Sequence, residues 1–563
     1  MKHILPFLAS FIFCLASATA KQSPNIIVVM TDDQGHGDLS ITGNPLLKTP
    51  HIDSLAKDGA WLTHFYVNPV CTPTRAALMT GRYPQRTRAY DTYVSRAQMD
   101  PEEITIAERL KEQGYNTGIF GKWHLGDCYP MRPSDQGFDQ SLIHMGGGLC
   151  QPADPIENNN RYTNPVLSHN NKQVQSTGYC TDVYFDHAIK FITKAHRTGK
   201  PFFVYLTPNA PHGPFHDVPK KNYKHFKGKT KDDKTARVFA MVENIDENMG
   251  RLLKHLDEKK LTQNTLVIFM TDNGPNGSRH NKPFRGIKGQ VTEGGVRTAF
   301  FARWPEKIKA GHRNATNAAH IDLFPTFLAM AGGEKPGKID GKSILPLLTG
   351  ETPSSWPSDR TMFFQWHRGD PEQRRKFCVV SGNWKLSSET DKVSKPSDIR
   401  LFRLSTDPGE KTNLASKHPE KVAAMLKQHD SWFTDIAATR KDAFAPCRIV
   451  IGTPHETHTR FTKQDWQRTE GQGWGKQGQW LIEASKESSY SARIYLGAKG
   501  HQEALQVTVH AGDHSFNTTI PANTALHEFE GLKIPVGKYK LRVTTRDGKA
   551  VPSLYQLHLI KSH

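Results

Sequence analysis

The chain has 563 residues, of which 36% are hydrophobic and 23% are charged, and its formal net charge is +19 at pH 7. This composition argues against a disordered or fibrous chain, and the length allows more than one domain. The positive charge favours polyanionic partners, with a simply solvated basic surface as the alternative; no recognised nucleic-acid-binding motif accompanies it, so we expect no nucleic-acid partner.

The first twenty residues have the layout of a signal peptide. A basic residue, Lys2, precedes an apolar stretch from Phe7 to Leu15, and the small residues Ala18-Thr19-Ala20 precede Lys21. The apolar stretch is shorter than the roughly 20 residues that a membrane-spanning helix needs. We therefore expect residues 1–20 to be removed and the mature protein to be secreted or periplasmic, with no transmembrane segment.

Apolar, β-branched runs alternate with amphipathic stretches through the next part of the chain. This alternation predicts an α/β domain over residues 21–359, with a mostly parallel central sheet flanked by helices. The expected strands are 26–30, 117–120, 202–206, 266–270 and 298–301, and the expected helices are 52–60, 104–113, 183–196 and 240–256.

The pattern changes twice after this domain. From Arg360, short strand candidates and one helical stretch predict a smaller α+β subdomain over residues 360–445, with strands at 362–366, 377–381, 384–387 and 401–404 and a helix at 418–436. From residue 446 to 563, alternating runs without a convincing helix predict an appended all-β, sandwich-like domain, with strands at 480–484, 492–496, 504–510 and 539–544.

Seven cysteines are present, and six remain once Cys14 leaves with the signal peptide. Cys150 and Cys180 are spaced for a bridge across an inserted loop, with free buried thiols as an equal alternative.

Two distant strands end in nearly the same oxygen-rich signature. The first expected strand leads into Asp32-Asp33, and the strand at 266–270 leads into Asp272-Asn273. Such residues are also common as helix caps and in turns. As a matched pair at strand ends, however, they predict a site for a hard cation such as Ca²⁺ or Mg²⁺, because converging carboxylates repel one another unless a cation lies between them.

Cys71 precedes a short predicted helix. Thr72 is expected as its N-cap, Pro73 as its first residue and Gly81 as its stop. The N-terminus of a helix favours an anion, and Arg75 in the first turn adds positive charge. A half-buried structural cysteine is the alternative reading of this segment alone.

Several segments together resemble the type I sulfatase family of the alkaline phosphatase superfamily. Cys71-Thr-Pro-Thr-Arg75 with the trailing Leu78-Met-Thr-Gly-Arg82 matches the modification signature of that family, which includes secreted arylsulfatase-type and polysaccharide sulfatases. Other segments also match the family, and they occur in the same order: 121–126, 211–213, 286–288, 293–297 and 401–414. The resemblance extends from Pro24 to Ala438.

The resemblance implies an alkaline phosphatase-like α/β fold and a sulfatase activity. It implies that a separate maturation enzyme oxidises Cys71 to formylglycine, whose hydrated aldehyde attacks the sulfur of a sulfate ester, as in a sulfated sugar. It also implies one divalent cation, Ca²⁺ with Mg²⁺ as the alternative, bound by formylglycine 71 and by Asp32, Asp33, Asp272 and Asn273.

The remaining matching residues are cations and histidines. By resemblance, His212 and Lys288 help the alcohol to leave, His124 removes a proton so that sulfate is eliminated, and Arg75 and Lys122 orient the modified residue and the sulfate. The residue types also make chemical sense on their own, since fixed cations stabilise charge on sulfate oxygens and histidines transfer protons near neutral pH. A lone lysine is ordinarily a solvated charge, and a lone histidine is often only a core or turn residue.

Substrate-selecting residues are less clearly marked. Candidates by their position after expected strands are His216, Trp366, His367 and Arg368. The aromatic residues of the last domain are either a sugar-stacking platform or sandwich core and interface, and they are Trp466, Trp474, Trp480, Tyr490 and Tyr495. Two rival functions are a phosphomonoester or phosphodiester hydrolase of the same superfamily and a catalytically silent protein that binds sulfated glycans.

Overall fold

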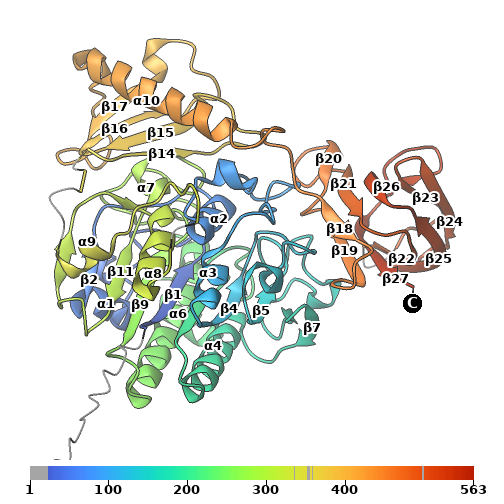
Figure 1. Cartoon of the computed structure of the whole chain (residues 1–563), viewed down its shortest axis with the longest axis horizontal. Helices are drawn as coiled ribbons and strands as arrows, with labels where there is room; N and C mark the ends of the chain where they lie inside the picture. The colour runs from blue at the N-terminus through green and yellow to red at the C-terminus, as the bar shows by residue number, and fades with distance from the viewer. Residues whose placement is uncertain (1–22, 335, 352–355, 358, 498–499, 563) are drawn as a thin grey trace, which may run out of the picture.

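The computed structural model describes residues 23–334, 336–351, 356–357, 359–497 and 500–562 (Figure 1). The predicted signal peptide, residues 1–20, lies outside the described residues. None of the helices in the described part of the chain combines the length and the hydropathy needed to cross a bilayer.

The first part of the described chain is built on one large mixed sheet. Its five central strands, β9, β1, β8, β4 and β5 in spatial order, all run parallel. Antiparallel strands extend the sheet at both edges. From edge to edge the order is β12 (His312–Asn314), β2 (Ala60–Leu62), β11 (Phe300–Arg303), β9 (Thr265–Thr271), β1 (Asn25–Thr31), β8 (Phe202–Thr207), β4 (Asn116–Lys122), β5 (Gln140–His144), β6 (Val166–His169) and β7 (Lys172–Gln175).

Helices cover both faces of this sheet, as Figure 1 shows. Alternate residues of β1 enter two separate cores: Ile26 and Val28 pack on one side, and Ile27 and Val29 pack on the other. The first core includes α2 (Cys71–Thr80), α3 (Ile106–Glu112), α8 (Leu323–Ala331) and α9 (Leu345–Thr349), and the second includes α1 (Pro50–Lys57), α4 (Cys180–Arg197) and α6 (Asp233–Glu258). The prediction of an α/β fold with a mostly parallel central sheet is confirmed.

Two predicted elements of this part were wrong in detail. The expected helix at 52–60 ends at Lys57, and Ala60 belongs to β2. Gly59 separates the two elements, and a β-carbon there would lie 2.2 Å from the carbonyl oxygen of Ala302. The expected strand at 298–301 is divided between β10 (Arg297–Thr298), which joins a small separate sheet, and β11, which runs antiparallel to β9.

A four-stranded antiparallel sheet and the helix α10 (Pro419–Ala437) follow (Figure 1). Lys385 ties this sheet to α7 (Glu293–Val296), because its ammonium nitrogen lies 2.9 Å from Glu293 Oε1 and 3.1 Å from Glu410 Oε1, all three side chains being fully buried. The expected strand at 362–366 stops one residue earlier, so that Trp366 lies just beyond it. The strands are β14 (Thr361–Gln365), β15 (Phe377–Ser381), β16 (Trp384–Ser388) and β17 (Arg400–Arg403).

The last part of the described chain is all β and consists of two sheets with a shared core. Trp466 and Trp480 are each 1% exposed within that core, so these two aromatic residues are structural. One sheet has the order β18 (Ile449–Ile451), β21 (Gln477–Ala484), β26 (Gly537–Thr545), β23 (Leu505–Ala511), β24 (His514–Ile520), with β20 (Gln467–Glu470) paired to β21. The other has the order β19 (His458–Thr462), β27 (Leu554–Lys561), β22 (Ser488–Leu496), β25 (Leu526–Ile534). We refer to residues 449–561 as the C-terminal β region.

Buried carboxyl groups meet where the C-terminal β region packs on the rest of the chain. Burial raises the pKa of Asp127, the Gly146 N–H opposes this, and the Glu456 carboxylate raises the pKa further, to about 7. Burial and Asp127 likewise raise the pKa of Asp465. A carboxyl whose pKa is raised by folding stabilises the folded state fully below its ordinary pKa of about 4, and this contribution is lost as the pH rises through the folded-state value.

We therefore expect the contribution of Asp127 to the thermal stability to depend on pH and to fall between about pH 4 and pH 7. Asp127→Asn should weaken that dependence, because the amide cannot ionise. Thermal unfolding followed at a series of pH values measures the effect, with the exposed Asp513→Asn as the control. Equal pH dependence in the wild type and in Asp127→Asn would show that Asp127 ionises normally.

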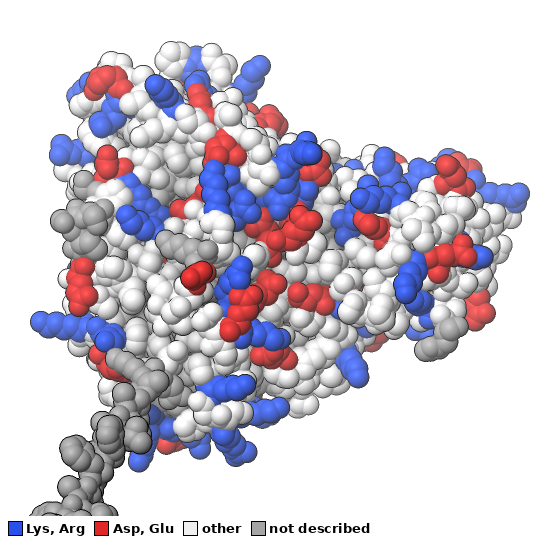
Figure 2. Space-filling model, viewed as in Figure 1, with Lys and Arg blue, Asp and Glu red and all other residues white. Residues whose placement is uncertain are grey.

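The six described cysteines, including Cys150 and Cys180, are all free thiols, so the bridge between those two is not formed. Figure 2 shows acidic and basic side chains interspersed over the face in view, without one dominant basic patch.

Candidate active site

The oxygen-rich signatures lie side by side at the carboxyl ends of the central parallel strands. Thr31 of β1 pairs in register with Thr271 of β9, so Asp32-Asp33 and Asp272-Asn273 leave the sheet next to each other. The Asp33 N–H donates to Asp272 Oδ1 at 3.2 Å, and Asn273 Nδ2 donates to Asp33 Oδ1 at 2.9 Å. All four side chains are fully buried.

Each of the three carboxylates has its own cation. Lys122 Nζ, at the end of β4, lies 2.6 Å from Asp32 Oδ2. Lys288 Nζ lies 2.6 Å from Asp33 Oδ1. Arg75, on α2, donates to Asp272 Oδ2 at 2.7 Å and to the Lys122 carbonyl at 2.8 Å. Lys122 and Arg75 are fully buried and therefore hold carboxylates in place, whereas the Lys288 side chain is 21% exposed.

The carboxylates differ in how easily they ionise. Burial opposes ionisation of Asp33, but the adjacent Lys288 ammonium holds the pKa of Asp33 well below its usual range. Burial and the neighbouring Asp32 raise the pKa of Asp272 to about 6, although Arg75 opposes them. Repulsion from Asp32 thus contributes to the raised pKa of Asp272, and a cation between these two acids would relieve it.

Cys71 is the first residue of α2, and Val70 is its N-cap. The prediction of Thr72 as the N-cap was therefore wrong. The Thr72 hydroxyl instead donates to the His124 carbonyl at 3.2 Å, which fixes the start of the helix to the loop after β4. Gly81 ends the helix as predicted, in the left-handed region at φ 67°. Burial raises the pKa of the Cys71 thiol above its ordinary value, despite Lys122, so the thiol itself is a poor nucleophile.

His124 faces the side chain of Cys71. Its Nδ1 lies 3.5 Å from Cys71 Sγ, and its Nε2 lies 2.8 Å from the Thr92 carbonyl oxygen. Since a carbonyl can only accept, Nε2 carries the proton and the lone pair of Nδ1 points at residue 71. Burial, followed by the charges of Lys122 and Arg75, lowers the pKa of His124 well below its usual value, so the ring is neutral.

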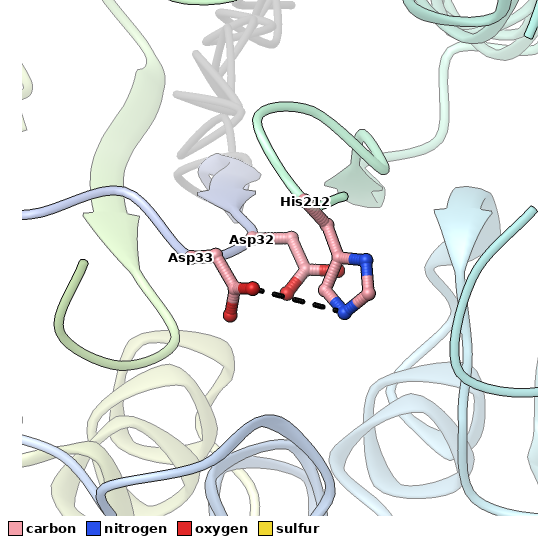
Figure 3. A group of neighbouring side chains, drawn as sticks. All are labelled: Asp32, Asp33 and His212. Carbon is pink, nitrogen blue, oxygen red and sulfur yellow. Dashed lines mark ion pairs between the residues drawn. The ribbon is translucent and has the colours of Figure 1, made fainter. Parts of the chain in front are cut away.

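His212 comes from the loop after β8. Its Nδ1 donates to the Gly213 carbonyl at 2.6 Å, and its Nε2 lies 3.7 Å from Asp33 Oδ2. Figure 3 shows His212, Asp32 and Asp33 pointing toward one another. Burial lowers the pKa of His212 to about 3, although Asp33 opposes it, so the neutral ring presents an unprotonated nitrogen to the acids.

The donor set fits a hard divalent cation. Ligand atoms of Asp32, Cys71 and Asp272 lie within 4.8 Å of one another, as do those of Asp32, Asp33 and His212. Asp32 Oδ1 and Asn273 Oδ1 are buried without a hydrogen-bond partner among the described residues. Such orphaned oxygens carry a large desolvation cost unless they bind something, and carboxylate and amide oxygens are ligands that Ca²⁺ and Mg²⁺ accept.

A pocket of about 580 Å³ opens above Cys71. Among its described lining residues there is no carboxylate, whereas Lys288 and Arg368 supply positive charge. Of the substrate-selecting candidates, Trp366 and Arg368 line the pocket, but His216 and His367 are not among its lining residues. The lining residues are Val70, Cys71, Thr92, Tyr93, His124, Gly147, Gln151, His212, Ile287, Lys288, Gly289, Gln290, Trp366, Arg368, Gly473 and Trp474.

The site also contains residues that the sequence did not mark. Gln464, in the C-terminal β region, donates to the Thr92 carbonyl at 2.8 Å and lies 3.2 Å from His124 Nε2. The Thr92 carbonyl therefore accepts from both Gln464 and His124. Tyr93 and Trp474 meet edge to face, with ring centroids 4.9 Å apart. Only Trp474 carried a prior signal, as an aromatic residue of the last domain.

Known proteins resemble this chain in sequence and in fold. The model of the sulfatase family matches residues 24–333, and that of the C-terminal part of N-sulphoglucosamine sulphohydrolase matches residues 288–432. The chain belongs to the sulfatase family. This confirms the resemblance that the sequence motifs indicated, and it assigns the protein to the sulfuric ester hydrolases.

Two relatives and one solved structure are similar to this sulfatase over about three quarters of its length. N-acetylgalactosamine-6-sulfatase of Canis lupus familiaris is 31% identical over 476 residues, covering 74% of this chain and 87% of the relative. Human arylsulfatase A is 33% identical over 470 residues, covering 74% and 89%. The crystal structure of Ps i-CgsB is 31% identical with a TM-score of 0.66, covering 73% of this chain and 93% of that chain.

Proposed function

We propose that this sulfatase hydrolyses a sulfate ester of a sulfated carbohydrate to an alcohol and inorganic sulfate, with residue 71 in its formylglycine form. The observation that carries the proposal is the position of Cys71 in a pocket that has cations and no carboxylate among its described lining residues. Such a pocket attracts an anionic ester. A carbohydrate is favoured by the mixture of aromatic and amide side chains around it, and Ps i-CgsB has been solved with k-i-k-neocarrahexaose bound.

Asp32, Asp33, Asp272, Asn273 and residue 71 would hold one divalent cation, for which Ca²⁺ is our first choice and Mg²⁺ the alternative. When bound, the cation would supply positive charge for the oxygens of the sulfate group. Formylglycine would supply, as its hydrate, a hydroxyl nucleophile and a route for expelling sulfate that an ordinary alcohol lacks.

The side chains of the site would transfer protons, stabilise the leaving group and position the carboxylates. His124 accepts a proton from the side chain of residue 71 at Nδ1, since its Nε2–H is held by the Thr92 carbonyl. Lys288, charged and facing the pocket, donates a hydrogen bond to the departing ester oxygen, with His212 beside it. Lys122 and Arg75 position Asp32 and Asp272 through the pairs described above.

The proposal includes three further parts. Residues 1–20 act as a signal peptide, so that the protein is secreted or periplasmic. A formylglycine-generating maturation enzyme oxidises Cys71. The chain is organised as domains 21–359, 360–445 and 446–563, of which the last two follow the catalytic α/β domain.

Two measurements on one preparation test the function. Mass spectrometry of the peptide that contains residue 71, from protein made with a maturation enzyme, should show conversion of the cysteine to the aldehyde. Ion chromatography should then show sulfate release from a panel of sulfated oligosaccharides. Phosphate release from aryl phosphates that exceeds sulfate release, with Cys71 unmodified, would overturn the proposal in favour of a phosphoester hydrolase.

A further inference from the structure

The C-terminal β region reaches the pocket through one hairpin. Strands β20 and β21 pair antiparallel, and the loop that joins them, residues 471–476, carries Gly473 and Trp474 to the pocket lining. These residues lie about 400 positions after Cys71 in the chain, and β21 is in turn paired to β18 and β26. The hairpin is therefore anchored in its own sheet.

The backbone of the loop is fixed by hydrogen bonds. The Trp474 carbonyl accepts from Trp466 Nε1 at 2.8 Å, and Trp466 is a core residue. The Gly473 carbonyl accepts from Arg468 Nη1 at 2.7 Å, and the Lys476 N–H donates to the Glu470 carbonyl at 2.9 Å. Glycines on both sides of Trp474 adopt positive φ angles, which other residues rarely do. The position of Trp474 is thus preset.

Trp474 lies one layer further out than the catalytic groups. His124 contacts residue 71, Thr92 contacts His124, and the next residue, Tyr93, contacts the indole of Trp474. Unlike the buried core residue Trp466, Trp474 is half-buried, and it lines the pocket. Its exposed surface therefore lies at the pocket, separated from residue 71 by Tyr93, Thr92 and His124.

The same rim carries a fixed cation. The Arg368 guanidinium stacks 4.3 Å from the Tyr93 ring centroid and 4.9 Å from the Trp366 ring centroid, and it donates to Asp91 at 2.6 Å. Aromatic faces with a few fixed polar groups are typical of a pocket that orients a small ligand. An aromatic face suits the C–H face of a sugar ring, while amide and guanidinium groups suit its hydroxyls.

We propose that Trp474 is a specificity-determining residue, which stacks on a sugar ring next to the one that carries the scissile sulfate. This inference rests on the proposed function. The C-terminal β region is then a wall of the active site, in contrast to a separate carbohydrate-binding module that acts at a distance.

The test compares two substrates. Trp474→Ala should raise KM for the sulfated oligosaccharide that the wild type desulfates fastest by about tenfold. It should change kcat/KM for 4-nitrophenyl sulfate by less than twofold, because that ester ends before the outer layer. Trp474→Phe, which keeps an aromatic face, should recover most of the loss. Trp384→Ala, a half-buried tryptophan on β16 that does not line the pocket, is the matched control.

The outcomes separate the two proposals. No sulfate release from either substrate by the wild type would overturn the proposed function. An active wild type with equal losses on both substrates in Trp474→Ala would show that Trp474 only supports the fold, and an unchanged KM for the oligosaccharide would show that no ring stacks there. Either result overturns the inference about Trp474.

Discussion

Cys71→Ala should abolish sulfate release, with a fall in kcat of at least about a thousandfold, as expected when a nucleophile is removed. The methyl group cannot be oxidised to an aldehyde, and it presents nothing to His124 Nδ1, which lies 3.5 Å from the sulfur of the natural residue. Sulfate release measured by ion chromatography checks the result. Cys71→Ser should be equally inactive when the maturation enzyme of the host acts only on cysteine.

The control for this variant is Cys378→Ala, another fully buried free cysteine, which lies on β15 outside the pocket. It should retain the activity of the wild type. Circular dichroism should show the same fold for Cys71→Ala as for the wild type, because the substitution removes only one small buried group. Full activity in a folded Cys71→Ala protein would refute the role of residue 71.

Removal of divalent cations should abolish activity and lower the melting temperature by a few degrees, and added Ca²⁺ should restore both. A ligand that binds only the folded state stabilises it by about 2.7 kcal/mol at a concentration one hundred times its dissociation constant. Asp32→Asn should abolish this Ca²⁺-dependent rise in melting temperature, because Asp32 contributes to both candidate ligand groups. Differential scanning fluorimetry with chelator, Ca²⁺ or Mg²⁺ measures the melting temperature independently of activity.

The readout is the shift caused by Ca²⁺, because Asp32→Asn also leaves the buried Lys122 ammonium without its partner and lowers the starting stability. Asp127→Asn, which alters a buried acid outside the site, should keep the full shift. If a chelator changes neither the melting temperature nor the activity of the wild-type protein, the proposed cation site is wrong.

The candidate site could be read from the sequence where it depends on the parallel sheet. Parallel strands end at one edge, so the residues after β1 and β9 had to meet, and the structure brings Asp32, Asp33, Asp272 and Asn273 together. The α/β fold could also be predicted, because parallel strands that are buried on both faces appear in the sequence as continuous apolar runs.

The rest of the candidate site depends on contacts between segments that lie far apart in the sequence, which no local pattern predicts. Gln464 reaches the Thr92 carbonyl from the loop between β19 and β20, across more than 370 positions of sequence. The tip of the β20–β21 hairpin likewise meets Tyr93 only after two sheets have packed against the catalytic part. The start of α2 was predicted wrongly because the Thr72 hydroxyl donates to the His124 carbonyl and so does not cap the helix. This is a contact with a distant segment, which the local sequence does not reveal.

The burial of Cys71 sets a limit on when it can be oxidised. The folded chain leaves this residue 2% exposed, so a maturation enzyme can reach it only before the surrounding segments close. The hairpin that completes the pocket belongs to a region in which Phe461 pairs with Leu557, a residue far downstream of Cys71. At roughly 5–20 residues per second, a ribosome needs on the order of 25 to 100 seconds to travel from residue 71 to residue 557. The proposed oxidation therefore competes with folding for that interval, and the yield of active enzyme from a given host depends on which of the two is faster.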